Sequence, residues 1–348
     1  IAAVSTGTQV CAIGIVRMSG GKAIEIADRL FSPVSGRKMA DCEDRKLIYG
    51  KLCDEQGRLL DICLCTISRA PNSYTGEDTA EFQCHGSPVV LRAVLEAAFS
   101  LGARQALPGE FTKRAFLNGR MDLSGAEAVA DIIDAETAEA ARNAAGQLGG
   151  AISRRIDEIY GTLTDISSHY HAVLDYPDED IEDFTLARYE SDIERCTAVL
   201  ESLRASYDSG KLLHSGVPAA IVGRPNAGKS SLLNAVLGYD RAIVTDIPGT
   251  TRDTIEEKLR LGGVLLRLTD TAGIRETDDE IERMGVTRSR RAMEQAELVL
   301  AVIDGHREIT CEDLELIKCA ERAPHGIVIL SKHDLGSLSK MPETTLPV

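Results

Sequence analysis

Short apolar runs dominate the first third of the chain, and one longer segment, Pro88 to Ser100, has the length of a helix. Runs of four to eight apolar residues are typical of buried strands. The runs are Ala12 to Val16, Leu47 to Cys53, Ile62 to Ile67 and Thr79 to Cys84. Strands mixed with a helix in this way predict an α+β domain, which we place at residues 1 to 118.

The pattern changes to a helical one at Ser124. Ser124 and Glu127 have the spacing of a capping box, which predicts that a helix starts there. Apolar residues then recur at steps of three and four, the spacing of one helix face, in two series. The series are Leu148, Ile152, Ile156, Ile159, Leu163, Ile166 and Tyr170, and Leu186, Tyr189, Ile193, Cys196, Leu200 and Leu203. Residues 119 to 213 are therefore predicted to form a helical bundle.

From residue 214 to residue 348, short β-rich runs alternate with helical segments. The runs are Pro218 to Val222, Ile255 to Leu261, Val264 to Thr269, Leu298 to Ile303 and Gly326 to Leu330. Alternation of this kind predicts a parallel α/β domain. Gly262 and Gly263 join the second and third runs, and a Gly-Gly pair is typical of a tight hairpin. We expect one antiparallel edge pair on an otherwise parallel sheet, as in small GTPases.

Composition narrows the class of protein. The 39 Lys and Arg against 54 Asp and Glu give a net charge of −15, which disfavours overall attraction to nucleic acid or anionic membranes. Nine cysteines without a CxxC pair suit reduced thiols, and Cys63 and Cys65 alternate with apolar neighbours. We therefore expect strand core at these two cysteines and no zinc site. Without an apolar run of about 18 residues, we expect a soluble, cytoplasmic protein.

The segment from Gly223 to Ser230 reads GRPNAGKS and fits the P-loop pattern GxxxxGK[ST]. It follows a predicted strand and precedes a predicted helix, Ser231 to Leu237, which is the context that the motif requires. Backbone N–H groups of such a loop surround phosphates, Lys229 reaches the β and γ phosphates, and the Ser230 hydroxyl ligates Mg²⁺. We expect nucleotide contacts from Asn226, Ala227, Gly228, Lys229, Ser230 and Ser231.

Two further segments complete the expected phosphate site. Asp270, Thr271, Ala272 and Gly273 read DTAG after a predicted strand, where an Asp supports the metal and a Gly senses the γ-phosphate. Between this segment and the P-loop lie Thr245, Thr250 and Thr251, in a stretch where a switch threonine completes the magnesium shell. Thr251 is the residue that we expect to ligate Mg²⁺ together with Ser230.

The base is expected to contact Ser331, Lys332 and Asp334, which follow the last predicted strand in the place of an NKxD motif. The Asp334 carboxylate can accept from guanine N1–H and the 2-amino group, a donor pair that adenine lacks. An unpaired buried carboxylate costs about 1 to 3 kcal/mol or more, which favours GTP over ATP. Ser331 stands where the motif has Asn. We expect this change to remove an amide that braces the loop and to lower guanine affinity.

The residue after DTAG is Ile274, whereas Ras-like enzymes place a water-orienting Gln there. Asn226 and the GTTRD stretch from Gly249 to Asp253 instead resemble the MnmE (TrmE) family of tRNA-modification GTPases. The similarity extends to Pro71 to Asp78, His85-Gly86, Pro108 to Phe111, Arg114 to Asn118 and Asp175 to Glu179. It thus covers nearly the whole chain.

For hydrolysis, the resemblance implies activation by K⁺, held by Asn226 and by oxygens of Thr245, Ile247 and Thr250. It implies that two GTPase domains of a homodimer approach each other to trigger hydrolysis, and that Glu282 acts as the catalytic acid that orients the water. An exposed Glu at a helix start is the alternative for Glu282. These roles come from the family and not from spacing.

For the N-terminal domain, the resemblance implies a tetrahydrofolate-binding fold that also makes the constitutive dimer. The matching positions are Arg17, Glu81 and Arg120, which would bind 5-formyl- or 5,10-methylene-tetrahydrofolate. Surface ion pairs are the alternative reading of these residues. Position 120 is Arg where relatives can have Lys, which keeps the charge but changes the geometry.

As a whole, the family modifies the wobble uridine of certain tRNAs at C5 with an aminomethyl-type group. Its partner is MnmG, an FAD protein, and the two form a heterotetramer.

The resemblance also implies a fragment: a fifth guanine-contacting loop, the second half of the helical domain and a C-terminal cysteine motif would follow Val348. Two alternatives are a ribosome-assembly GTPase and a folate-dependent aminomethyltransferase with a regulatory GTPase domain. Folate binding would count against the first of these.

Overall fold

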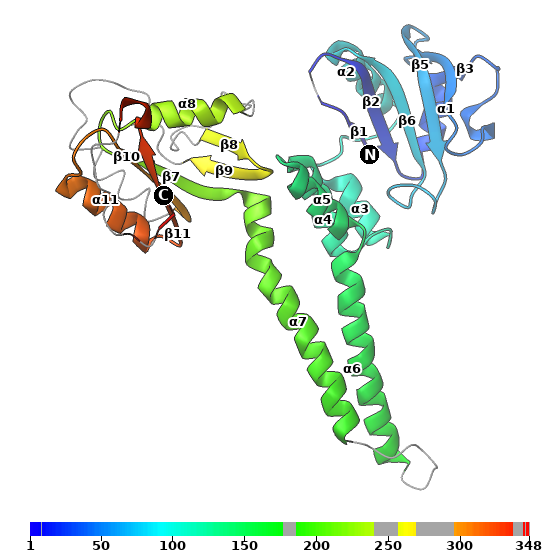
Figure 1. Ribbon diagram of the computed structural model, residues 1–348. Helices are drawn as coiled ribbons and strands as arrows, with labels where there is room; N and C mark the ends of the chain where they lie inside the picture. Colours follow the sequence, from blue (N-terminus) through cyan, green and yellow to red (C-terminus); the bar gives the residue numbers. More distant parts are fainter. Residues whose placement is uncertain are drawn as a thin grey trace. The chain divides into compact units, whose positions relative to one another are not determined.

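The computed structural model describes residues 1–7, 9–176, 186–239, 257–268, 296–336, 344 and 346–347. These residues form two compact units (Figure 1). One comprises Ile1–Ala130 with Gln147–Arg154, and the other comprises Asp131–Gly146 with Arg155–Val348.

The first unit contains a six-stranded antiparallel sheet in the order β1-β2-β6-β5-β4-β3. The strands are β1 (Ala2–Val4), β2 (Cys11–Ser19), β3 (Phe31–Pro33), β4 (Ile48–Cys53), β5 (Leu59–Ser68) and β6 (Thr79–Gly86). Strands β2, β4, β5 and β6 lie at the four predicted runs, which confirms them. Burial alternates along β4, β5 and β6 with a period of two, as expected for a sheet with one buried face.

Helices α1 (Ala23–Leu30) and α2 (Pro88–Ser100) pack on this sheet and cover its buried face. The core beneath them includes Met18, Leu30, Phe31, Phe82 and Val94, each at most 2% exposed. Cys63 and Cys65 belong to this core, which confirms the burial predicted from their alternation. The bounds of α2 are those predicted from the sequence. Helix α3 (Glu110–Leu117) follows a left-handed Gly109.

The middle of the chain is helical, with α4 (Leu123–Asp134), α5 (Ala138–Leu148), α6 (Ala151–Asp175) and α7 (Leu186–Ser215). The predicted start at Ser124 is wrong. Ser124 lies inside α4, and the Asp122 carboxylate instead accepts the Gly125 N–H at 2.7 Å. A carboxylate at this position accepts from a backbone N–H of the first turn, so Asp122 provides the cap.

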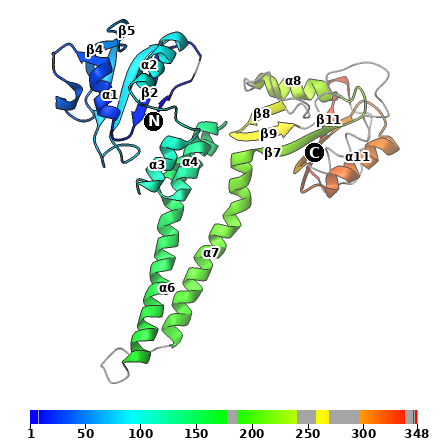
Figure 2. The ribbon, with the colours of Figure 1, turned by 180° about the vertical axis from the view of Figure 1, so that it is seen from behind.

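The long helices α6 and α7 lie side by side in both views (Figure 2). His169 on α6 and Tyr189 on α7 are hydrogen-bonded, and their ring centroids are 5.9 Å apart. This contact joins α6 to α7 through Tyr189, a member of the second apolar series, and His169, which belongs to neither predicted series.

The second unit contains a five-stranded sheet in the order β11-β10-β7-β9-β8. The strands are β7 (Val217–Val222), β8 (Glu257–Leu261), β9 (Val264–Leu268), β10 (Leu298–Asp304) and β11 (His325–Ser331). All pairs are parallel except β8 with β9, where Leu261 faces Val264 across the Gly262-Gly263 turn. The predicted parallel sheet with one antiparallel edge pair is therefore confirmed.

Helices α8 (Lys229–Tyr239) and α11 (Cys311–Arg322) cover this sheet with separate apolar clusters. Leu233 of α8 packs against β7, β8 and β9 residues, whereas Ile317 of α11 packs against β10 and β11. Within the described residues, none of the helices combines the length and the apolar character that crossing a membrane requires.

Candidate functional site

The loop between β7 and α8 has the backbone shape of a phosphate cradle. At Gly223 a Cβ atom would lie 2.5 Å from the Val302 carbonyl oxygen, so no other residue fits without movement of β10. Asn226 and Gly228 have φ angles of 61° and 96°, which place both in the left-handed region. These two reversals turn the loop back onto the start of α8, where helix N–H groups favour an anion.

Lys229, the first residue of α8, points into this loop. Its Nζ donates to the carbonyl oxygens of Gly223 at 2.7 Å and Arg224 at 2.9 Å. Burial lowers the pKa of this lysine, because the surrounding loop replaces water around the ammonium group. Phosphate oxygens would supply the compensating negative charge. Ser230 and Ser231 follow in the first turn of α8, where the Ser230 hydroxyl could ligate Mg²⁺.

Ser331, at the end of β11, contacts the P-loop. Its Oγ donates to the Ala227 carbonyl oxygen at 2.5 Å and lies 3.1 Å from the Ile303 carbonyl oxygen of β10. A hydroxyl has one proton, so it donates to one of these acceptors at a time. The sequence predicted that Ser in place of Asn removes an amide that braces the loop and lowers guanine affinity, and the effect on affinity stays a prediction. The serine hydroxyl itself links the strand end to the P-loop.

Lys332 follows Ser331 directly, and Asp334 lies two residues further on. Lys332 has a left-handed φ of 59°, and its Nζ donates to Asp304 Oδ2 at 2.7 Å. This hydrogen bond lowers the pKa of Asp304 and links the end of β10 to the segment that follows β11. Asp334 is exposed in the short 3-10 helix η2 (His333–Leu335), where a base could reach its carboxylate.

The structure thus brings Asn226, Ala227, Gly228, Lys229, Ser331 and Lys332 together at the ends of β7, β10 and β11. The remaining predicted residues lie outside the described ones: Thr245, Ile247, Thr250, Thr251, Asp270, Thr271, Ala272, Gly273 and Glu282. Of the expected Mg²⁺ ligands, the structure therefore describes Ser230, and of the expected K⁺ ligands it describes Asn226.

Sequence reasoning missed Arg224, the second residue of the P-loop. Its guanidinium donates to Thr310 Oγ1 at 3.2 Å and lies 3.6 Å from the Asp313 carboxylate. Thr310 and Asp313 form the capping box of α11, and Asp313 is 5% exposed. The signal in the sequence was the T-x-x-D spacing from Thr310 to Asp313, which marks a helix start with a carboxylate that can pair with a guanidinium.

A second polar cluster lies on the face of the first sheet opposite its core. Arg17 of β2 and Glu81 of β6 face each other in the register, and Arg17 Nε donates to Glu81 Oε1 at 2.6 Å. The guanidinium also lies 5.3 Å from the Tyr74 ring centroid and 5.7 Å from that of Phe111. A planar ligand could stack between such groups while the carboxylate accepts from its N–H donors.

Arg120 lies against the loop that carries Tyr74. A Cβ atom at Gly76 would lie 3.2 Å from Arg120 Cγ, so this loop passes directly over the Arg120 side chain. Asn118 fixes the approach, because its Nδ2 donates to the Thr75 carbonyl oxygen at 2.7 Å. Arg17 and Glu81 are therefore in direct contact, whereas Arg120 lies beside the loop whose Tyr74 ring contacts Arg17.

Charged pairs hold the neighbouring segments in place. Arg114 donates to Glu77 at 2.9 Å and to Glu110 at 3.0 Å, and Arg104 also binds Glu110. Hydrogen bonds from Arg104 first, then from the Leu107 N–H, hold the pKa of Glu110 well below its usual range. Burial raises the pKa of Glu77, but hydrogen bonds from Ser19 and Arg114 outweigh it, and the net shift is downward.

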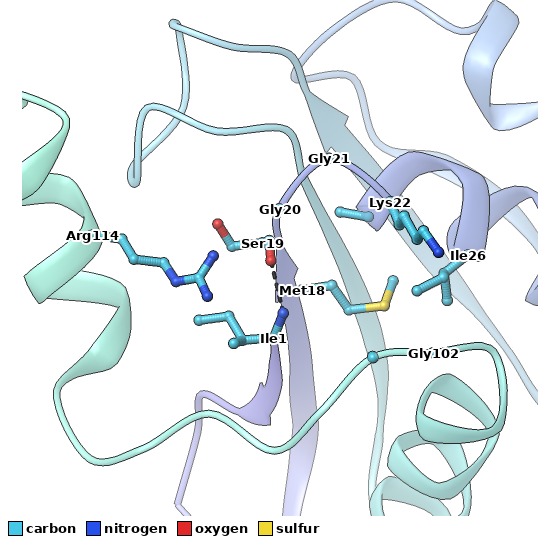
Figure 3. A pocket seen from close by; sticks show the side chains of 11 residues that line it. Ile1, Met18, Ser19, Gly20, Gly21, Lys22, Ile26, Gly102 and Arg114 are labelled. Carbon is cyan, nitrogen blue, oxygen red and sulfur yellow. Dashed lines mark hydrogen bonds between the residues drawn. The ribbon is translucent and has the colours of Figure 1, made fainter.

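Arg114 also lines a cavity of about 190 Å³ (Figure 3). Ser19, Gly20, Gly21, Lys22 and Arg114 supply its polar lining. Arg17, Glu81 and Arg120 do not line this cavity. The polar cluster around Arg17 is therefore a separate feature of the same unit.

Comparison with known proteins gives two family matches. The family described as GTP-binding protein TrmE N-terminus matches residues 1–120, and the family described as 50S ribosome-binding GTPase matches residues 218–332.

Relatives that carry the name tRNA modification GTPase MnmE match nearly the whole chain. The protein of Clostridioides difficile (strain 630) is 44% identical over 96% of this chain and 72% of its own length. The protein of Geobacillus thermodenitrificans (strain NG80-2) is 46% identical over 96% and 73%. The protein of Thermoanaerobacter pseudethanolicus (strain ATCC 33223 / 39E) is 45% identical over 96% and 73%.

Proposed function

The chain belongs to the MnmE family of tRNA modification GTPases, and we propose that it binds and hydrolyses GTP in the modification of tRNA. The observation that carries the nucleotide part is the P-loop, where Gly223 packs against β10 and the half-buried Lys229 donates to two carbonyl oxygens of the loop. A lysine with a lowered pKa inside a ring of backbone groups is suited to an anionic ligand.

In this proposal, each described residue has a defined task. Lys229 exchanges its two carbonyl acceptors for β and γ phosphate oxygens, and Ser230 ligates the Mg²⁺ that neutralises them. Asp334 accepts from guanine, while Ser331 and Lys332 hold its segment against the P-loop and Asp304. Water attack on the γ-phosphate then depends mainly on positioning and on charge stabilisation.

We further propose that K⁺ supplies part of that stabilisation. Asn226 would ligate it with Thr245, Ile247 and Thr250, and Glu282 would orient the water once two GTPase domains of a homodimer meet. Support comes from Asn226, whose left-handed backbone lies at the turn of the loop. The test is GTP turnover in K⁺ and in Na⁺ at equal ionic strength. Equal rates would refute the potassium part, and unchanged turnover of Glu282→Ala would dismiss that residue.

For the first unit we propose binding of 5-formyl- or 5,10-methylene-tetrahydrofolate at Arg17, Glu81 and Arg120. Arg17 and Glu81 offer a guanidinium and a carboxylate 2.6 Å apart beside two aromatic rings. This arrangement fits a flat heterocycle with N–H donors and an acidic tail. Titration with 5-formyltetrahydrofolate tests it, and a flat titration would favour a ribosome-assembly GTPase instead.

The substrate that we propose is the wobble uridine of tRNA, modified at C5 together with an MnmG-like FAD protein in a heterotetramer in the cytoplasm. Folate would supply the one-carbon unit, and GTP hydrolysis would drive the cycle. Reconstitution of the full-length protein with its flavoprotein, tRNA, folate and GTP tests this, with the modified nucleoside measured by mass spectrometry. Omitting GTP should abolish the product.

A further inference from the structure

Two buried cysteines face each other on neighbouring strands of the first sheet. The antiparallel register pairs Leu64 of β5 with Gln83 of β6, so Cys63, one residue earlier, lies opposite Cys84, one residue later. Cys63 is 5% exposed and Cys84 is 2% exposed. Their separation in the sequence hides this pairing, which arises only when the strands align.

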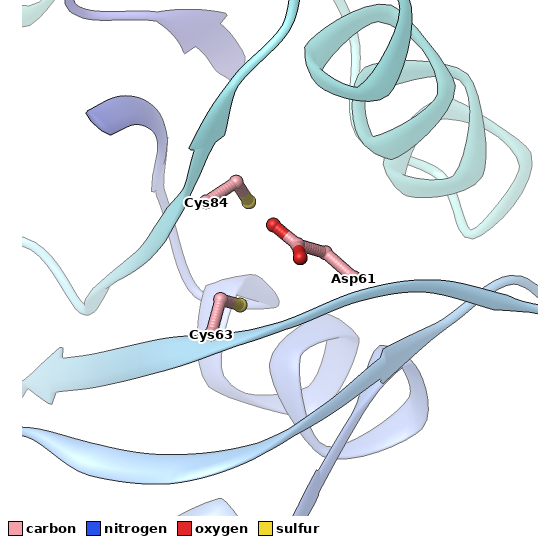
Figure 4. A group of neighbouring side chains, drawn as sticks. All are labelled: Asp61, Cys63 and Cys84. Atoms are coloured by element: carbon pink, nitrogen blue, oxygen red, sulfur yellow. The ribbon is translucent and has the colours of Figure 1, made fainter. Parts of the chain in front are cut away.

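A carboxylate completes the group. Asp61 lies two residues before Cys63 on the same face of β5, and its carboxylate points between the two sulfur atoms (Figure 4). One ligand atom of each residue lies within 4.8 Å of the other two. Thiolates about 2.3 Å from a tetrahedral Zn²⁺ are roughly 3.8 Å apart, so side-chain adjustments of about 1 Å or less would close the site.

Contrary to the sequence-based expectation of no zinc site, we propose that Asp61, Cys63 and Cys84 bind a thiophilic divalent cation, for which Zn²⁺ is the best fit. Two thiolates and one carboxylate match the ligand preference of zinc, whereas Mg²⁺ and Ca²⁺ require oxygen ligands. The three groups leave one position of a tetrahedral site for water. The site is independent of the proposed nucleotide and folate sites.

The carboxylate is held in the orientation that a ligand needs. The backbone N–H of His85 donates to Asp61 Oδ2 at 2.8 Å, and that of Ile62 donates to Oδ1 at 2.8 Å. The His85 Nδ1 atom lies 2.9 Å from Oδ1. Ligating carboxylates in metal sites are commonly fixed by hydrogen bonds of this kind. His85 therefore acts as a positioning residue.

Solvent can reach the group from one side. The His85 side chain is 77% exposed and that of Asp61 is 11% exposed, whereas both cysteines are buried. A cation would arrive past the carboxylate, and a water molecule would fill the fourth position from that side. Binding would cross-link β5 to β6, the strand that carries Glu81.

The test is titration of the full-length protein, reduced and stripped with a chelator, with Co²⁺ as a spectroscopic probe for Zn²⁺. We expect one Co²⁺ per chain at this site, a thiolate-to-cobalt band in the near ultraviolet, and displacement by Zn²⁺. Cys63→Ala and Cys84→Ala should each remove the band. Cys65→Ala is the matched control, because Cys65 lies on the same strand and face and is 0% exposed, yet it is not part of the group.

Asp61→Asn provides a test that does not alter the buried cysteines. It should weaken Co²⁺ binding by about tenfold or more, because it removes the ligand charge while keeping the shape. Absence of the band in the wild type, an equal band in Cys84→Ala, or unchanged affinity in Asp61→Asn would each overturn the proposal. A Cys63–Cys84 disulfide in the native protein, detected by mass spectrometry, would also overturn it.

Discussion

Ser331 Oγ donates a hydrogen bond to the carbonyl oxygen of Ala227 at 2.5 Å, and this contact ties the end of β11 to the P-loop. The two residues are separated by 104 positions in the chain. The segment that we propose contacts the base and the loop that we propose contacts the phosphates are thereby held in one geometry. The short Ser331 side chain can reach the Ala227 carbonyl oxygen because Gly228 has no side chain. A Cβ atom at Gly228 would lie 3.1 Å from Ser331 Cβ and crowd this contact.

Replacing Ser331 by Ala should weaken GDP and GTP binding by roughly fivefold, since one hydrogen bond contributes about 1 kcal/mol. The effect reaches the nucleotide through the P-loop, so inosine nucleotides should lose as much affinity as guanine nucleotides. Fluorescence titration measures this, with Ser206→Ala on α7 as control, since Ser206 bonds within its own helix. A loss confined to guanine nucleotides would indicate direct base contact instead.

Asp334→Asn should abolish most of the preference for GTP over ATP. The amide cannot accept from guanine N1–H and the 2-amino group as a carboxylate does, and losing such pairing costs about 1 to 3 kcal/mol. Competition between GTP and ATP for a fluorescent nucleotide measures the ratio. Glu308→Gln removes another exposed carboxylate of the same unit and should leave this ratio unchanged. An unaltered ratio in Asp334→Asn would dismiss Asp334 as the guanine reader.

Glu81→Gln and Arg17→Ala should each reduce 5-formyltetrahydrofolate affinity by at least about tenfold, because each removes one member of the charged pair that we propose contacts the ligand. Calorimetric titration gives the affinities. Arg58→Ala is the matched control, since Arg58 also forms an ion pair in this unit, with Asp54, but lies away from Tyr74 and Phe111. Equal losses in the control would point to a stability effect.

Stability of the first unit should fall in acid. The pKa values of Glu77 and Glu110 are lower in the folded protein than the usual value of about 4.3. Their contribution is therefore complete above pH of about 4.3 and is lost as the pH falls through the folded-state values. Thermal unfolding between pH 7 and pH 3 measures it. Glu110→Gln should unfold at lower temperature at pH 7 and show a flatter acid dependence; a parallel curve would contradict the assignment.

Much of the fold followed from local pattern. Helix α2 and the β8–β9 hairpin could be predicted because Pro88 begins a mainly apolar segment of helix length and Gly262-Gly263 permits the left-handed turn. Strands β1 and β3 have three residues each, and α1 and α3 have eight, which is too short for periodicity to stand out. The cap at Asp122 was missed because Ser124 offered the same chemistry two residues later.

The candidate sites likewise include features that the sequence predicts and contacts that it does not. P-loop residues are contiguous, so Gly223 to Ser230 could be identified from spacing alone. The Ser331 brace, the Arg224 contact with Asp313 and the opposition of Cys63 and Cys84 join residues far apart in the chain. Such contacts depend on strand order and register, which short-range patterns do not encode.

Phosphate release from GTP and from ATP by the full-length protein, in potassium buffer with Mg²⁺, tests the central claim most directly. Lys229→Ala is the blank, because it removes the ammonium group from the P-loop and leaves the sheet intact. The account predicts phosphate release from GTP, little from ATP, and none above background in the variant. Equal release from both nucleotides, or a rate unaffected by Lys229→Ala, would contradict it.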